Sequence, residues 1–164
     1  MGMMTNRIAL VTGASSGIGL ATATTLAREG ADVAVLARPE DDRSEAVRQV
    51  TSHGRRALAV CVDVRDSAAV RAAFERAEAE LGPIDAVLNN AGISRVAPLV
   101  DTTDQDFDDL MAINVAGSFY VLREAARVMQ PRGAGAIVNT GSELALMGQP
   151  GFVAYTATKG AIVA

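Results

Sequence analysis

Some residue types are scarce in this sequence, which has one cysteine, one histidine and no tryptophan. A single cysteine cannot form an internal disulfide bond, which favours a reducing compartment, and we expect a cytoplasmic protein. The net charge of −4 provides no positive surface for nucleic acid or an anionic membrane, so we expect neither as a partner. Apolar runs are too short for a transmembrane helix, and residues 1–7 are too polar for a signal peptide.

Metal ligands are scarce as well. His53, the sole histidine, precedes Gly54 at a predicted helix end and has no second ligand at useful spacing. We therefore expect His53 at the surface and predict no metal site. Cys61 lies in an apolar run and is predicted to be a small residue of the core.

Apolar residues make up 49% of the chain, and its length suits a single domain. Strand and helix patterns alternate, which is typical of β-α-β units with a parallel sheet. We predict an α/β fold, a Rossmann-type doubly wound sheet in three α/β/α layers. The predicted strands cover 8–11, 32–38, 58–63, 86–90 and 136–141. The predicted helices cover the stretch after the first glycines, then 41–52, 67–81, 103–129 and a last one from about 153.

Helical spacing also predicts which side chains are buried and which residues begin the helices. Ser67 and Thr103 are predicted to cap two helices. In the first helix the predicted buried face is Ile18, Ala21, Thr25 and Leu26. In the helix over 67–81 it is Val70, Ala73, Phe74, Ala77 and Leu81.

Three glycines, Gly13, Gly17 and Gly19, lie between the first strand and the first helix. Glycine has no Cβ and adopts positive φ, so bare N–H groups there can approach a phosphate. The positive end of the helix dipole points at the same place. This G-x-x-x-G-x-G spacing favours dinucleotide binding over an ordinary strand–turn–helix corner.

Polar residues follow every predicted strand: Thr12, Arg38, Asp63, Asn90 and Ser142. The carboxyl ends of parallel strands meet at one edge, where doubly wound sheets bind ligands. The sequence therefore predicts a binding site at this edge.

Tyr155 and Lys159 are four residues apart and hence on one face of the last helix. A lysine ammonium beside a tyrosine favours the phenolate, which suits an acid/base for interconverting an alcohol and a carbonyl. Ser142 could hydrogen-bond the same substrate oxygen. A surface Tyr–Lys pair on an amphipathic helix is the alternative.

Asn114 lies in the mostly apolar stripe of the helix over 103–129. A buried asparagine must be hydrogen-bonded to protein or to water. Its position fits either a structural amide at a helix kink or a proton relay.

As a set these residues resemble the short-chain dehydrogenase/reductase family in its single-domain form. The resemblance runs through residues 12–19, 63–64 and 89–92, then Asn114, Ser142, Tyr155 and Lys159, over nearly the whole chain. It implies the strand order 3-2-1-4-5 and a nicotinamide cofactor.

The resemblance also implies roles for single residues. Tyr155 would be the acid/base, Lys159 would assist it and bind the nicotinamide ribose, and Ser142 would polarise the carbonyl. Asn114 would hold a water that links Lys159 to solvent. The implied cofactor-binding residues are Gly13, Ser15, Ser16, Gly17, Ile18, Gly19, Arg38, Asp63, Val64, Asn90, Ala91, Gly92, Tyr155 and Lys159.

Cofactor choice depends on the end of the second strand. An acidic residue there would bind the ribose 2′-hydroxyl of NAD, whereas an arginine accommodates the 2′-phosphate of NADP. Arg38 occupies that corner, with Ser15 nearby, so we predict NADP, with NAD as the second choice. Ser16 stands where many NADP-dependent relatives carry a second basic residue.

The family pattern continues beyond Ala164, and we expect residues 1–164 to be one NAD(P)-binding domain that is incomplete at its C-terminus. Three hypotheses follow. The first is an NADP(H)-dependent oxidoreductase resembling 3-oxoacyl-acyl-carrier-protein reductases or sugar and polyol dehydrogenases. The second is a non-catalytic dinucleotide-binding fragment without a closed substrate pocket. The third is a partner-dependent protein, since relatives associate through the helices that correspond to 103–129 and 153–164.

Overall fold

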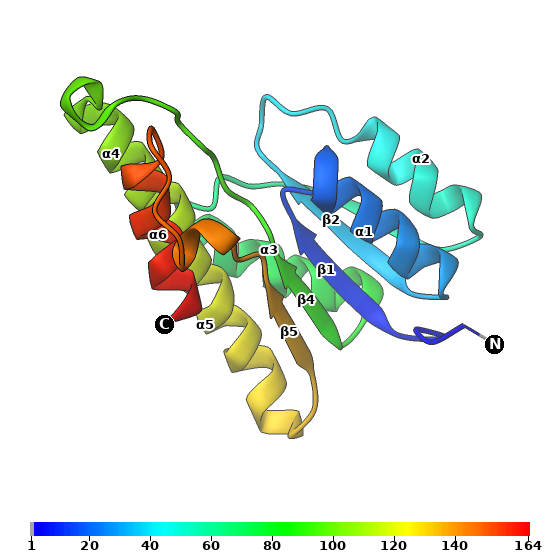
Figure 1. Ribbon diagram of the computed structural model, residues 1–164. Helices are drawn as coiled ribbons and strands as arrows, with labels where there is room; N and C mark the ends of the chain where they lie inside the picture. The colour runs from blue at the N-terminus through cyan, green and yellow to red at the C-terminus, as the bar shows by residue number, and fades with distance from the viewer. Residues whose placement is uncertain (1) are drawn as a thin grey trace.

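A parallel sheet of five strands forms the centre of the molecule (Figure 1), in a computed structural model that describes residues 2–164. The strands are β1 (Ile8–Thr12), β2 (Asp32–Ala37), β3 (Ala57–Cys61), β4 (Ala86–Asn89) and β5 (Ala136–Asn139). Their order is β3-β2-β1-β4-β5, which confirms the predicted α/β topology. From β1 the chain adds β2 and β3 on one side of the sheet, and then β4 and β5 on the other side. Doubly wound sheets bind their ligands at this switch point, between β1 and β4.

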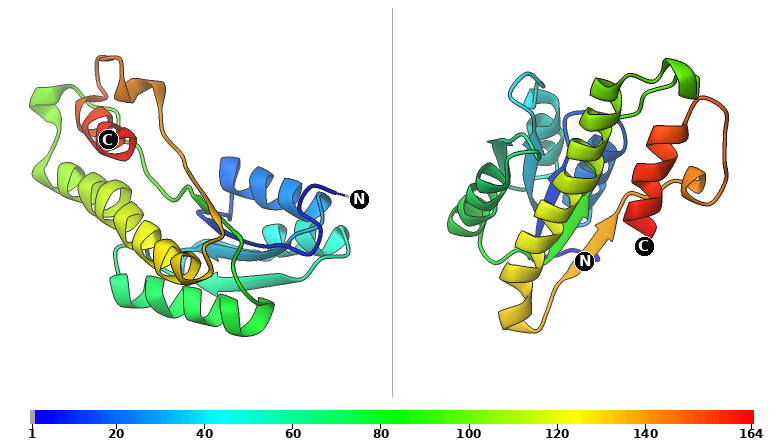
Figure 2. Two further views of the ribbon diagram at one scale, coloured as in Figure 1. Left: turned by 90° about the horizontal axis from the view of Figure 1, so that it is seen from below. Right: turned by 90° about the vertical axis from the view of Figure 1, so that its left-hand side faces the viewer.

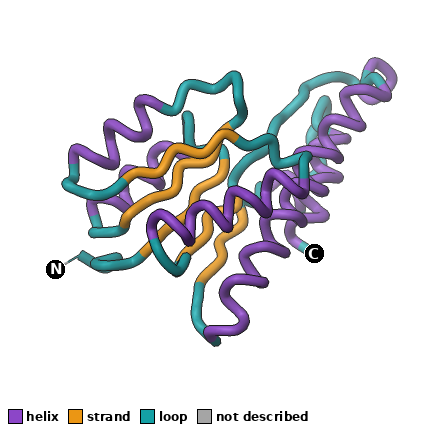
Figure 3. Tube along the Cα trace, turned by 180° about the vertical axis from the view of Figure 1, so that it is seen from behind, coloured by secondary structure: helices purple, strands orange, loops and turns teal. Residues whose placement is uncertain are grey.

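Helices cover both faces of the sheet, giving three layers (Figure 2). On one face, α1 (Gly17–Arg28) and α2 (Ser44–Ser52) pack over β1 and β2. On the other face lies α3 (Ser67–Leu81), beside the long helix over residues 104–129, which Figure 3 shows running across the same side. A last helix, α6 (Val153–Val163), packs against the first half of that long helix.

Alternating side chains of β1 pack into two separate cores, one on each face of the sheet. Ile8 and Leu10 pack with α3 and the long helix, whereas Ala9 and Val11 pack with α1 and α2. All five residues of β1 and all six of β2 are buried, because both faces of these central strands are covered. The glycine turn therefore follows a strand that is buried along its whole length.

The buried face of α1 differs from the prediction. Gly19, Ala23 and Ala27 are buried, whereas Ile18, Ala21 and Thr25 face solvent. Of the predicted face, only Leu26 packs against the core, where it is partly buried. The helix lies so close to β1 that only very small side chains fit between them. Helical periodicity of large apolar residues predicted the wrong face because this contact is made by glycine and alanine.

Predictions for α3 and β3 gave mixed results. The predicted face of α3, from Val70 to Leu81, is buried as expected. Asp66, not Ser67, caps this helix, accepting hydrogen bonds from two backbone N–H groups of the first turn. Cys61 is exposed, contrary to the prediction, because it ends an edge strand whose burial alternates along its length. His53 is exposed as predicted.

The predicted helix over 103–129 is continuous in direction but not in hydrogen bonding. It consists of α4 (Asp104–Leu110), a π-helical segment η2 (Met111–Gly117) and α5 (Ser118–Met129). Thr103 caps it as predicted, accepting a hydrogen bond from the backbone N–H of Asp106. Asn114 lies in the π-helical segment, a feature that is frequent at functional sites.

The β5 strand is the edge of the sheet beside α6, and all four of its residues are exposed.

Within residues 2–164, every helix falls short of the length and hydrophobicity that crossing a bilayer requires.

Candidate active site at the carboxyl edge of the sheet

The turn between β1 and α1 needs glycine for two different reasons. Gly13 and Gly17 have φ angles of +64° and +52°, in the left-handed region that disfavours a side chain. Gly19 has no such angle, but a Cβ there would lie 2.1 Å from the carbonyl oxygen of Gly13. The helix begins at Gly17 without a side-chain cap, so the N–H groups of its first turn face the turn unpaired. Such a turn is suited to a phosphate group.

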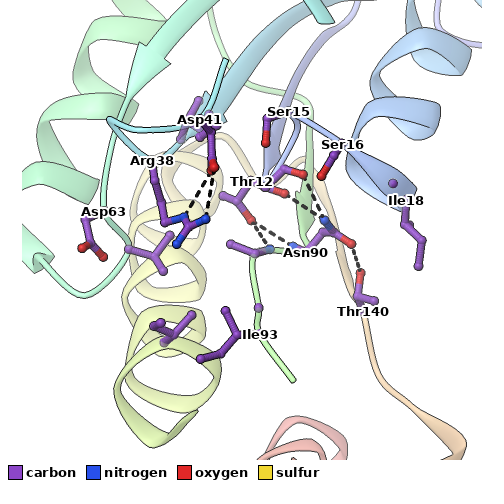
Figure 4. Close-up of a pocket in the computed structure, with 18 of the residues that line it drawn as sticks. Thr12, Ser15, Ser16, Ile18, Arg38, Asp41, Asp63, Asn90, Ile93 and Thr140 are labelled. Atoms are coloured by element: carbon purple, nitrogen blue, oxygen red, sulfur yellow. Dashed lines mark hydrogen bonds and ion pairs between the residues drawn. The ribbon is translucent and has the colours of Figure 1, made fainter. Parts of the chain in front are cut away.

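Side chains from three strand ends hold this turn in place (Figure 4). The Thr12 hydroxyl accepts hydrogen bonds from the backbone N–H groups of Asn90, at 2.9 Å, and Ala91, at 3.0 Å. The Asn90 amide donates in return to the carbonyl oxygens of Thr12, at 3.2 Å, and Gly13, at 3.4 Å. The Thr140 hydroxyl donates to Asn90 Oδ1 at 3.1 Å. The ends of β1, β4 and β5 are thereby tied together.

A cavity of about 490 Å³ opens at this edge, a size typical of sites for small molecules and cofactors. Thirteen of the predicted site residues line it: Gly13, Ser15, Ser16, Gly17, Ile18, Arg38, Asp63, Val64, Asn90, Ala91, Gly92, Tyr155 and Lys159. Gly19, Asn114 and Ser142 are not part of its lining. Residues that are spread over most of the chain therefore lie around one cavity.

Lys159 is buried beside this cavity. Its ammonium Nζ donates a 2.6 Å hydrogen bond to the backbone carbonyl of Thr140 and lies 5.8 Å from the centre of the Tyr155 ring. Burial lowers the pKa of Lys159 because the apolar surroundings disfavour the charged form. A buried cation thus faces the tyrosine within cation–π range, as the four-residue spacing predicted.

Asn114 connects the long helix to two other elements. Its amide nitrogen donates to the carbonyl of Ile93, at 2.9 Å, and to Thr158 Oγ1, at 3.1 Å, and its oxygen accepts from the N–H of Ile93 at 2.8 Å. Thr158 in turn donates to the carbonyl of Tyr155 at 2.7 Å. Both donors of the Asn114 amide are used within the protein, as the structural interpretation of this residue expects.

Ser142 lies just after β5 and is half-buried. Its hydroxyl accepts a 3.2 Å hydrogen bond from the N–H of Leu144 and so begins the short helix η4 (Glu143–Ala145). The hydroxyl proton is free to be donated to another acceptor.

Charged side chains gather at the far end of the cavity, after β2 and β3. The Arg38 guanidinium donates to both carboxylate oxygens of Asp41, and these bonds raise its pKa. Arg65 binds both oxygens of Asp63, and these bonds hold the pKa of Asp63 below its usual value of 3.8. Two arginine–carboxylate pairs therefore lie at the end of the pocket away from Tyr155.

Comparison with known proteins agrees with this geometry. A family model described as short chain dehydrogenase matches residues 7–164. The chain belongs to the short-chain dehydrogenase family. Gluconate 5-dehydrogenase from Gluconobacter oxydans (strain 621H) is 46% identical over 154 residues, which are 94% of this chain and 60% of that protein. D-threitol dehydrogenase from Mycolicibacterium smegmatis is 37% identical, over 96% of this chain and 60% of its own.

Solved structures of family members superpose closely on this one. A short-chain type dehydrogenase/reductase from Mycobacterium marinum has a TM-score of 0.94 at 34% identity, covering 98% of this chain and 66% of its own. An NAD⁺-bound xylitol dehydrogenase has a TM-score of 0.93 at 37% identity, covering 98% of this chain and 62% of its own. The chain spans about 60% of the length of the curated relatives that it matches.

Some lining residues of this short-chain dehydrogenase site were missed from the sequence. Thr140 and Asp41 carry hydrogen bonds that shape the cavity, and Ile93 lies on its wall. Thr140 follows β5 and could have been found by the same strand-end rule that found Asn90. Asp41 lies beyond Pro39, and only the fold of the turn brings its carboxylate back to Arg38.

Among residues 2–164, no group of three or more His, Cys, Asp or Glu side chains is arranged to hold a metal ion.

Proposed function

We propose that this chain is the cofactor-binding and proton-transferring part of an NADP(H)-dependent oxidoreductase that interconverts a secondary alcohol and a carbonyl. The observation that carries the proposal is that Tyr155 and buried Lys159 share one cavity with the glycine turn. Neither feature alone is specific. Together they support the proposal of an acid/base that works beside a bound dinucleotide.

The residues present fit a dinucleotide. Gly13 lies so close to the segment after β4 that a Cβ there would be 3.0 Å from Ala91 Cα, and a Cβ on Gly19 would be 2.1 Å from the Gly13 carbonyl oxygen. Unpaired N–H groups at the start of α1 suit a pyrophosphate, and Val64 and Asp63 line the end of the cavity beyond it. Asn90 supports the turn from β4.

The bound nicotinamide would supply or accept the hydride, and the protein would manage the proton and the orientation of the substrate. In our proposal the Tyr155 hydroxyl donates a proton to the substrate oxygen in reduction and takes it back in oxidation. The Lys159 ammonium favours the phenolate by its charge and contacts the nicotinamide ribose. Ser142 donates its free hydroxyl proton to the same substrate oxygen.

We assign Asn114 a positioning role for its side chain, because both of its amide donors are committed to Ile93 and Thr158. Through Thr158 it fixes the backbone of Tyr155. A water that links Lys159 to solvent would have to be held by an oxygen of Asn114 rather than by its amide nitrogen.

For the cofactor we propose NADP(H), with Arg38 as the partner of the 2′-phosphate. Arg38 lines the cavity at the end of β2 and presents a planar guanidinium that suits phosphate. Replacing Arg38 with Asp is expected to weaken NADPH binding much more than NADH binding. Equal weakening of both nucleotides would overturn this assignment.

For the substrate we propose a polyol or sugar acid. The names of similar proteins support this class, since gluconate, D-threitol and xylitol are all polyhydroxylated. The test is oxidation of these three compounds by the purified chain with NADP⁺ or NAD⁺, followed as reduced-nicotinamide absorbance. Turnover that is lost in Tyr155→Phe, while nucleotide binding is kept, would support the mechanism.

Binding without turnover of any of these substrates would instead favour a dinucleotide-binding fragment that is not catalytic alone.

For association between copies of the chain we propose the surfaces of the long helix and of α6. Phe107 and Phe119 on the long helix stay exposed, as do Val153 and Val163 on α6. Light scattering after gel filtration tests this, and a monomer at all concentrations would contradict it.

A further inference from the structure

The guanidinium of Arg38 is already engaged on two sides. Its Nε and Nη2 groups donate to the two carboxylate oxygens of Asp41, at 3.2 Å and 3.1 Å, in a bidentate pair. Its Nη1 group lies 3.1 Å from Glu40 Oε1. Figure 4 shows the Arg38 fork pointing toward Asp41. A phosphate that approaches Arg38 therefore meets a guanidinium that two carboxylates already hold.

Asp41 is held in this position by the fold of the turn. Its backbone N–H donates to the carbonyl of Arg38 at 3.1 Å, closing the turn between them. The Arg43 side chain donates to the carbonyls of both residues and pins the same turn. These bonds are all made to backbone atoms, so they persist whatever side chain occupies position 41.

The Asp41 side chain is also better protected than that of Glu40. It is 25% exposed and lines the cavity, whereas the Glu40 side chain is 61% exposed and makes a single contact with Arg38. Charge-assisted bidentate bonds are stronger than single exposed ones. Of the two carboxylates, Asp41 therefore neutralises more of the positive charge that Arg38 presents to the cavity.

Building on the proposed function, we propose that Asp41 is a specificity-determining residue that competes with the 2′-phosphate of NADP(H) for Arg38. The phosphate carries more charge than a carboxylate and can displace Asp41, but the displaced carboxylate remains beside it and repels it. A nucleotide with a 2′-hydroxyl requires no displacement, because Asp41 can stay on Arg38. Asp41 therefore lowers the affinity for NADPH and leaves NADH binding largely unaffected.

The experiment compares Asp41→Asn with the wild-type chain in titrations with NADPH and with NADH, followed by nicotinamide fluorescence. Asparagine keeps the size of the side chain and an acceptor oxygen but removes the charge. We expect the Kd for NADPH to fall about tenfold and the Kd for NADH to change less than about threefold. The adenosine half, 2′,5′-ADP, should gain affinity to a similar degree in competition with NADPH.

Asp42→Asn is the matched control, because it removes the same charge one residue away. Asp42 bonds Ser44 and makes no hydrogen bond to Arg38, so both Kd values should stay close to wild type. A ratio of NADPH to NADH affinity that is the same in Asp41→Asn as in the wild type would overturn the proposal. So would an equal shift in Asp42→Asn, because the effect would then be one of general charge.

These results separate the proposal from the NADP(H) assignment on which it builds. If the wild type binds only NADH and Asp41→Asn gains NADPH, the role of Asp41 stands and the NADP preference fails. If the wild type prefers NADPH and Asp41→Asn keeps the same ratio, the preference stands and the role of Asp41 fails. Binding of neither nucleotide by the wild type would overturn both.

Discussion

Lys159 and Thr140 are joined by a 2.6 Å hydrogen bond from the ammonium of α6 to the backbone carbonyl that follows β5. The Thr140 hydroxyl donates to Asn90, and the Asn90 amide donates to the carbonyl of Gly13. A set of hydrogen bonds therefore runs from Lys159, which lies beside the proposed acid/base Tyr155, to the glycine turn. The same residues that close the cofactor pocket also position the lysine.

Replacing Thr140 with Val removes the hydroxyl but keeps the backbone carbonyl that receives Lys159. We expect the free energy of unfolding to fall by about 1 kcal/mol, because Asn90 Oδ1 loses its donor. NADPH binding should weaken a few-fold while the pH dependence of turnover stays the same. Urea unfolding and nucleotide titration measure the two effects. Thr140→Ser should restore both, and a Val variant with a shifted pH profile would contradict this role.

Replacing Lys159 with Met keeps the length of the side chain but removes the charge beside Tyr155. For alcohol oxidation we expect kcat near neutral pH to fall about 100-fold or more, and the rise of the rate to move to higher pH. The reason is that no neighbouring cation then favours the phenolate. The pH profile of kcat measures this. An unchanged profile with a lower rate would indicate that Lys159 acts only in binding.

Two alanine substitutions in the glycine turn should differ in their cost. Gly19→Ala places a Cβ 2.1 Å from the carbonyl oxygen of Gly13, and we expect a loss of about 3 kcal/mol together with weak nucleotide binding. At Gly17 a Cβ would meet no other heavy atom within 4 Å, so only the φ of +52° opposes alanine, at a cost of about 1 kcal/mol. Urea unfolding of both variants tests the order, which equal losses would contradict.

Asp32, at the opposite edge of the sheet, should make stability depend on pH. Burial alone would raise its pKa, but hydrogen bonds from Arg56 and the charges of Arg55 and Arg56 outweigh burial and hold it below 3.8. The stabilisation is therefore fully present above the unfolded pKa and is lost as pH falls through the lower folded pKa.

Asp32→Asn should accordingly cost about 2 to 3 kcal/mol at neutral pH, since it leaves two arginines without their buried partner. The difference from wild type should shrink as pH falls below 3.8. Urea unfolding across this range measures it. A difference that grows in acid would have the wrong sign for a carboxylate with a lowered pKa.

The strands, and most of the residues that line the cavity, could be predicted because they depend on short patterns. Apolar runs predicted the strands. The polar residues predicted after the first four strands, Asn90 among them, line the cavity, whereas Ser142 after the fifth does not. The glycines of the turn were identifiable because two of them need positive φ and the third needs a close approach. The order of the strands in the sheet came instead from the resemblance to the short-chain dehydrogenase/reductase family.

The errors have a common physical reason, which is that they depend on contacts between elements. Ile18 is exposed because α1 approaches β1 through glycine and alanine, which carry little signal in a periodicity of large residues. Cys61 is exposed because β3 is an edge strand. Asp41 was missed because its carboxylate reaches Arg38 only through the turn at Pro39.

The most direct test of the central claim is a titration of the purified 164-residue chain with NADPH and NADH in parallel, followed by nicotinamide fluorescence. The account predicts saturable binding of both nucleotides, tighter for NADPH, with binding weakened in Gly19→Ala. Saturable binding that Gly19→Ala leaves unchanged, or no binding of either nucleotide by a folded chain, would contradict it.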